Sequence, residues 1–176
     1  MTILNIFLLV FGGLMAFLLI AALFMRKEYH VRREIIINTS SKRVFDYLKL
    51  LKNQDNFNKW VMVDPGMKRD FVGTDGTVGF IYRWNGNKKA GEGELELKSL
   101  IESSKIETEI RFVRPFPAVA FSDYVFEIVS DNQTKVIWGN RSKMIFPMNI
   151  MVSMVEKMLA KDMDISLSNL KTILER

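Results

Sequence analysis

The chain contains no cysteine and only one histidine, His30. The absence of cysteine excludes disulfide scaffolds, cysteine-ligated zinc, iron–sulfur clusters and thiol catalysis. A single imidazole also excludes metal or catalytic sites that are built from several histidines. We therefore predict no metal site and no cofactor, and we expect His30 to be a solvated or interfacial side chain.

Charge is missing from the beginning of the chain, because no Asp, Glu, Lys or Arg occurs before Arg26. As a helix, the apolar run Ile3–Met25 would be about 34 Å long, which is enough to cross a hydrocarbon core about 30 Å thick. No basic residue precedes the run, and its last residues, Leu23 to Met25, are poor cleavage residues. We therefore predict an uncleaved transmembrane helix and not a cleaved signal peptide.

Basic residues follow this run directly, at Arg26, Lys27, Arg32 and Arg33, which predicts that the remainder of the chain faces the cytoplasm. The segment Arg26–Lys59 holds nine basic and four acidic residues, so it carries the whole net charge of +5. Two interpretations stay open: contact with anionic lipid headgroups, or a solvated face that also directs orientation. No basic stripe with base-contacting elements is evident, so no nucleic-acid partner is predicted.

Glycine and proline are absent from Met148 to Glu175, where apolar residues recur at helical spacing. This pattern predicts one long amphipathic helix. Near the beginning of the soluble part, Tyr29–Ile37 is typical of a strand. Two short helices are expected next, over 42–51 and 53–61.

The middle of the chain alternates between apolar and polar residues, which is typical of antiparallel strands. Six such strands are expected over 67–72, 78–85, 90–101, 105–113, 118–129 and 134–144. Together with the first strand they make a curved antiparallel sheet of about seven strands. The long helix is the only element large enough to cover one face of that sheet, so we predict an α+β fold.

Several local strings occur in an order that resembles the START-like (SRPBCC) superfamily, which includes the birch pollen allergen. The strings are Thr39–Phe45, Trp60, Trp84–Gly86, Ala90–Leu95, Phe112–Phe116, Thr134–Trp138 and the closing helix with Leu167, Leu170 and Leu174. The chain is most similar to the polyketide cyclase/dehydrase-like branch, with an added N-terminal membrane anchor. The resemblance implies a helix-grip fold around a deep apolar pocket, and it implies no particular reaction.

One set of side chains should face a shared interior between the sheet and the long helix. We predict that these residues line a pocket: Trp60, Phe80, Tyr82, Trp84, Thr108, Tyr124, Phe126, Trp138, Asn140, Met151, Val155 and Met158. Rigid aromatic rings opposite a methionine-rich helix suit variable apolar ligands. A filled core, in which the same residues simply pack together, is the alternative.

No catalytic residues are predicted. Glu92, Glu94 and Glu96 alternate with Leu95 and Leu97, so we expect the carboxylates on the outer face, opposite a basic residue such as Arg111. Without cysteine and with a single histidine, the inner polar residues contain no nucleophile–base pair.

The sequence therefore predicts a transmembrane anchor over 1–27 and a START-like domain over 28–176. We expect this domain to bind an apolar or amphipathic, lipid-like small molecule. An enzyme of the cyclase/dehydratase kind is an alternative, in which Tyr82, Tyr124 or Asn140 would polarise a carbonyl. A further alternative is a protein-docking module without a working pocket.

Overall fold

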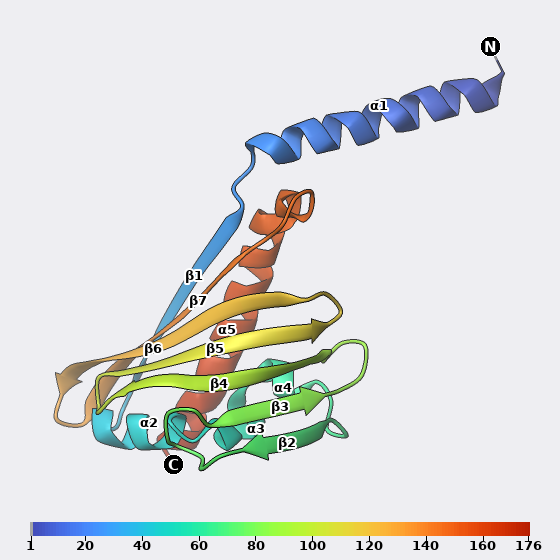
Figure 1. The fold of residues 1–176 in the computed structure, drawn as a ribbon. Helices are drawn as coiled ribbons and strands as arrows, with labels where there is room; N and C mark the ends of the chain where they lie inside the picture. Colours follow the sequence, from blue (N-terminus) through green and yellow to red (C-terminus); the bar gives the residue numbers. More distant parts are fainter. Residues whose placement is uncertain (1) are drawn as a thin grey trace.

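The computed structural model describes residues 2–176 and has one seven-stranded sheet, one long C-terminal helix and one apolar N-terminal helix (Figure 1). The elements follow in the order α1 (Ile3–Phe24), β1 (Glu28–Ile37), α2 (Ser41–Leu48), η1 (Leu51–Asn53), α3 (Gln54–Phe57), α4 (Lys59–Met62), β2 (Lys68–Val72), β3 (Ile81–Asn85), β4 (Glu92–Ile101), β5 (Lys105–Arg114), β6 (Ala118–Ser130), β7 (Gln133–Lys143), η2 (Met148–Met151) and α5 (Val152–Leu174).

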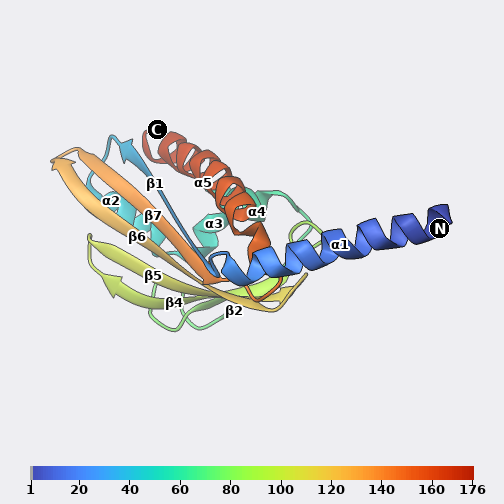
Figure 2. The ribbon, with the colours of Figure 1, turned by 90° about the horizontal axis from the view of Figure 1, so that it is seen from above.

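The strands lie in the order β1-β7-β6-β5-β4-β3-β2, and every neighbouring pair is antiparallel. The first strand, β1, forms one edge of the sheet and pairs with the last strand, β7. The α5 helix lies across one face of the curved sheet (Figure 2). The predicted α+β helix-grip fold is confirmed.

Alternation along the strands selects the inner face, as the sequence predicts. On β6, Ala120, Ser122, Tyr124 and Phe126 are buried. Ile128 is next on this side by alternation, which predicts that it is buried too, but it is 71% exposed, because it lies at the far end of the β6–β7 hairpin beside an irregularity in the register. The inner face therefore ends before the hairpin tip.

The two short helices differ from the prediction in their bounds. The first, expected over 42–51, is α2 over Ser41–Leu48, and Leu51–Asn53 form the separate η1. The expected helix over 53–61 is divided into α3 and α4, because Asn58 adopts an extended conformation between them. Its side chain accepts a hydrogen bond from the backbone N–H of Trp60 and so caps α4. This break points the chain back toward α5, where Trp60 contacts the helix through Asp162.

The α1 helix is joined to the beginning of α5 through a buried asparagine. The Asn149 side chain donates to the carbonyl oxygens of Ala22 at 2.6 Å and Met25 at 3.2 Å. Helix C-termini leave carbonyls without intrahelical partners, and Asn149 satisfies two of them. Arg26 forms an ion pair with Glu156 at 3.0 Å beside this contact.

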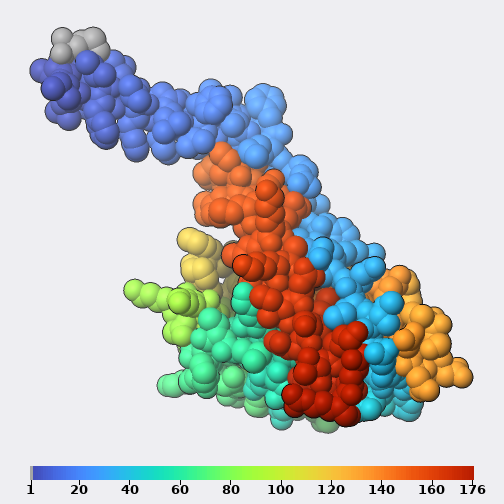
Figure 3. Space-filling model, turned by 180° about the vertical axis from the view of Figure 1, so that it is seen from behind, coloured from blue at the N-terminus to red at the C-terminus, as the bar shows by residue number. Residues whose placement is uncertain are grey.

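Beyond this joint, α1 projects away from the rest of the molecule (Figure 3). Ala22 is its one buried residue within the described part of the chain. The helix is long and apolar enough to span a membrane.

Candidate functional site

A cavity of about 470 Å³ lies between α5, α4 and the inner face of the sheet. Most of the residues predicted to line a pocket meet here. They are Trp60, Tyr82, Trp84, Thr108, Tyr124, Trp138, Asn140 and Met158. The space between sheet and helix is therefore not completely filled by side chains.

Four residues predicted for the pocket do not line the cavity. Phe80 stacks on Phe71, with ring centroids 6.2 Å apart, and Phe126 packs edge-on against Phe45 at 6.1 Å. Both phenylalanines lie on the correct face of the sheet but belong to the solid core under α2 and η1.

Met151 and Val155 are the other two, and they miss the cavity for a different reason. Met151 belongs to η2, beside the end of α1, and Val155 lies in the first turn of α5. The cavity reaches α5 only at Met158, Leu159 and Asp162. The helical spacing selected the correct face of the helix but not the correct turn.

The cavity wall is built from aromatic rings that hold one another in place. Trp138 stacks on Tyr124, with centroids 5.1 Å apart and an interplanar angle of 20°. The edge of Trp60 meets Trp138 at 5.6 Å, and Trp84 meets Phe112 at 5.9 Å. Stacked and edge-to-face contacts of this kind add to the stability gained from burial.

Each indole N–H on this wall has a fixed hydrogen-bond partner. Trp138 donates to Ser122 at 2.7 Å, Trp84 to the carbonyl of Ala90 at 3.1 Å, and Trp60 to Asp162 at 3.1 Å. These bonds orient the rings, so the wall resists collapse into the space beside it.

Gly93 determines how deeply Trp84 sits against the sheet. A Cβ atom at Gly93 would lie only 2.6 Å from the Trp84 ring, on the neighbouring strand. The glycine therefore allows the indole to lie flat over β4. The register irregularity between Glu92 and Gly93 occurs at the same place, as expected for a strand that bends.

The hydroxyl of Tyr82 forms hydrogen bonds with two charged side chains. It donates to Asp55 at 2.5 Å and accepts from Arg69 at 3.0 Å, and Arg69 also pairs with Asp55 at 2.9 Å. Burial, followed by the hydrogen bond to Asp55, raises the pKa of Tyr82 well above its ordinary value. The Tyr82 ring lines the cavity, but its hydroxyl ties β3 to α3. No periodic pattern in the sequence identifies Asp55 and Arg69 as partners of this hydroxyl.

The hydroxyl of Tyr124 is in the opposite situation. The side chain is only 3% exposed, and its oxygen has no hydrogen-bond partner among residues 2–176. Burial raises the pKa of Tyr124, so the hydroxyl keeps its proton. Asn140, on the neighbouring strand β7, accepts a hydrogen bond from Tyr29 at 3.1 Å.

Charged residues lie at the opening of the cavity. Lys59, Lys89, Arg114 and Asp162 contribute to its lining. Lys59 forms an ion pair with Asp162, and Arg114 pairs at 2.7 Å with Glu92 on the outer face. The opening is therefore polar and mainly positive, whereas the wall is apolar.

The glutamates of β4 do not belong to the cavity, in agreement with the sequence. Arg111 on β5 pairs with Glu94 at 2.6 Å and with Glu96 at 2.7 Å. The hydrogen bond from Arg111 is the largest cause that lowers the pKa of Glu94. These residues form an ion-pair network on the outer face.

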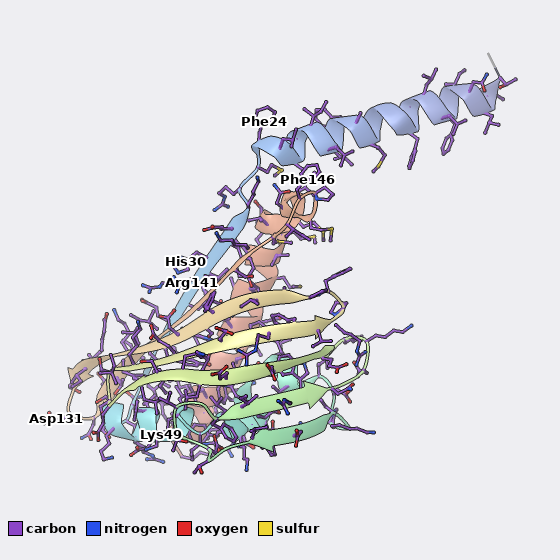
Figure 4. All side chains as sticks on the ribbon, in the orientation of Figure 1. Phe24, His30, Lys49, Asp131, Arg141 and Phe146 are labelled. Atoms are coloured by element: carbon purple, nitrogen blue, oxygen red, sulfur yellow. The ribbon has the colours of Figure 1, made fainter. Side chains whose placement is uncertain are left out.

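A second and larger hollow, of about 1060 Å³, lies on the outer face near the end of α1. Its lining includes His30, Phe121 and Arg141. His30 and Arg141 face each other across β1 and β7 (Figure 4). His30 is exposed, as predicted.

No family model matches the chain, and a search of curated protein sequences finds no match. Solved structures do match. Norcoclaurine synthase from Thalictrum flavum, in complex with dopamine and hydroxybenzaldehyde, is 10% identical, with a TM-score of 0.63 over 88% of this chain and 90% of that one. Ara h 8.0201 is 10% identical, with a TM-score of 0.59 over 84% and 97%.

The Aha1 dimer from Colwellia psychrerythraea is 17% identical to the chain, with a TM-score of 0.57 over 84% of this chain and 96% of that one. At these identities, the similarities establish the fold and no activity. They show that the chain shares the helix-grip fold of these structures.

Proposed function

We propose that the protein is a membrane-anchored binder of an apolar or amphipathic, lipid-like small molecule. The observation that carries this proposal is the cavity of about 470 Å³, with its aromatic wall and positively charged opening. Pockets for small organic molecules are mostly apolar and have a few well-placed polar groups. A docking module with a filled interior would have no reason to keep such a space.

The position of α1 supports delivery of the ligand from a bilayer. The helix projects over the side of the domain where the β3–β4 and β5–β6 loops lie (Figures 1 and 2). Lys89 and Ala90 from the first loop and Pro115 from the second line the cavity. In this proposal, residues 1–27 span the membrane and residues 28–176 form a START-like domain of the polyketide cyclase/dehydrase-like branch.

We further propose that the domain faces the cytoplasm, because the basic residues follow α1 and none precedes it. The absence of cysteine allows a direct test. The Asp131→Cys variant carries a single thiol at the exposed β6–β7 hairpin. A membrane-impermeant maleimide should label it only after cells are lysed. Labelling in intact cells would contradict the orientation.

The cyclase/dehydratase alternative loses one of its candidate residues. The Tyr82 hydroxyl is held by Asp55 and Arg69, so it is not free to polarise a carbonyl. No further observation favours a reaction over binding, and we propose binding alone.

The tryptophans provide a direct test of binding, because all three of them line the cavity. Bromine atoms quench tryptophan fluorescence at close contact. We therefore expect saturable quenching when 9,10-dibromostearic acid is titrated into the full chain in phospholipid nanodiscs. Nanodiscs made with brominated phospholipid alone should quench much less.

A matched pair of variants controls for binding elsewhere on the protein. The double variant Leu95→Phe/Ile110→Phe adds bulk inside the cavity, whereas Val113→Phe/Val119→Phe adds at least as much bulk at exposed outer positions. Quenching should fall in the first variant and persist in the second. Equal quenching in both, or a titration without saturation, would contradict the proposed function.

A further inference from the structure

The Tyr124 hydroxyl is a buried hydrogen-bond donor that the protein leaves without an acceptor. The ring is fixed against Trp138, so the hydroxyl cannot turn out to solvent without breaking that stack. Its oxygen has no partner within the described residues. Because a buried polar group without a partner destabilises the folded state, its retention in a cavity wall indicates a use.

Each of the other polar side chains on this wall has at least one hydrogen-bond partner. Ser122 accepts from Trp138, and Thr108 donates to the Ser122 carbonyl at 3.3 Å. Asn140 accepts from Tyr29. Gln54 is the polar neighbour that lowers the Tyr124 pKa, as a donor to the phenolic oxygen does, but it places no acceptor in hydrogen-bonding geometry with the hydroxyl, and its own oxygen accepts from Asn58 at 2.7 Å. The Tyr124 hydroxyl therefore lacks a hydrogen-bond acceptor.

We propose that Tyr124 donates a hydrogen bond to the bound molecule, which is an apolar compound with an uncharged carbonyl oxygen, such as a ketone, ester or quinone. This inference rests on the proposed function and names the chemistry of the ligand. A carbonyl oxygen accepts hydrogen bonds and brings no donor of its own, so it satisfies the hydroxyl completely.

Two other occupants fit this position less well. A carboxylate would be buried without a cation, because Lys59, Lys89 and Arg114 belong to the opening, and an unpaired buried charge is strongly disfavoured. An ordered water needs two to four polar partners, and every other polar side chain on this wall already has one of its own. An acidic group on the same ligand fits the positively charged opening.

The test compares two naphthalene probes that differ only at the carbonyl. They are 6-propionyl-2-(dimethylamino)naphthalene and its analogue 6-propyl-2-(dimethylamino)naphthalene. Binding to the full chain in nanodiscs is measured by energy transfer from the tryptophans of the cavity wall. Tyr124→Phe should weaken binding of the ketone by about threefold to tenfold, the usual effect of losing one neutral hydrogen bond, and leave the affinity for the propyl analogue unchanged.

Tyr47→Phe is the control, because it removes a hydroxyl that lies outside the cavity lining and bonds to Asn56. It should alter neither affinity. A second readout is the infrared stretch of the bound ketone, which should shift to higher wavenumber in Tyr124→Phe when the hydrogen bond is lost.

Equal weakening of both probes, or an unchanged carbonyl stretch, would overturn the role of Tyr124 and leave the binding function intact. If the wild-type chain binds neither probe and also fails the dibromostearic acid titration, the proposed function itself is overturned. The two failures are therefore distinguishable.

Discussion

The two ends of the space between α5 and the sheet contrast sharply. Toward the C-terminus, Met163, Leu167, Leu170 and Leu174 are buried and pack against the solid core. Toward the N-terminus of the same helix, Met158 is 54% exposed and borders the cavity. The same helix and the same sheet thus enclose both a packed core and the cavity.

The difference lies in what holds the side chains. In the packed part, aliphatic residues of α5 and phenylalanine rings such as Phe126 fill the space between the layers. Around the cavity, large aromatic rings are held back by hydrogen bonds, such as those of Trp60 to Asp162 and Trp138 to Ser122. Fixed rings cannot move together to fill a gap, so a space remains.

Shortening a side chain should lower the free energy of unfolding much more in the packed part than beside the cavity. Leu170→Ala leaves a cavity in the packed part and should lower the free energy of unfolding by about 2–5 kcal/mol. Met158→Ala removes an exposed side chain and should cost less than about 1 kcal/mol. Thermal unfolding of the full chain, followed by near-ultraviolet circular dichroism, measures both. Similar losses would mean that the two ends of α5 are packed alike.

Within the cavity wall, removing the hydroxyl of Tyr82 and removing that of Tyr124 should have different effects on the free energy of unfolding. Tyr82→Phe loses a hydrogen bond to a charged group and should cost about 1.5–3 kcal/mol. In the ligand-free protein, Tyr124→Phe removes an unpaired hydroxyl and should cost nothing or stabilise the fold slightly. Unfolding in detergent freed of lipid measures the pair. A clear loss for Tyr124→Phe would indicate that a protein group or water already satisfies this hydroxyl.

Removing an ion pair from the outer face should change the free energy of unfolding least, and the size of this change should depend on pH. The pKa of Glu94 is lowered in the folded state, chiefly by Arg111, so the stabilisation is complete above the ordinary glutamate pKa. It is lost as pH falls through the lowered value. Arg111→Met should therefore cost up to about 1 kcal/mol near pH 7, and the cost should shrink toward pH 3. Urea unfolding at both values checks this, and a difference that grows on acidification would contradict it.

Local patterns were sufficient to predict the elements and their order. Alternation placed Tyr82, Tyr124 and Trp138 on the inner face, and the segment free of glycine and proline became α5. These patterns succeed because the period of a strand or helix decides which side chains share a face, whatever lies opposite.

The same patterns could not distinguish a residue of the core from a residue of the cavity. Phe80 and Tyr82 lie on the same face of the sheet, yet only Tyr82 lines the cavity. Whether a side chain on this face lines the cavity or packs in the core depends on the distance between α5 and the sheet at that position. This distance depends on side chains from segments far apart in the sequence.

Residues close together in the chain specify the uncharged helix Ile3–Phe24, the strands of the antiparallel sheet and the long closing helix. The tertiary fold brings Asp55 and Arg69 to the Tyr82 hydroxyl and leaves the Tyr124 hydroxyl without a partner among residues 2–176. It also decided that Asn149 caps the end of α1. These contacts join segments far apart in sequence, and a hydrogen bond depends on distances of a few tenths of an ångström that no periodicity encodes.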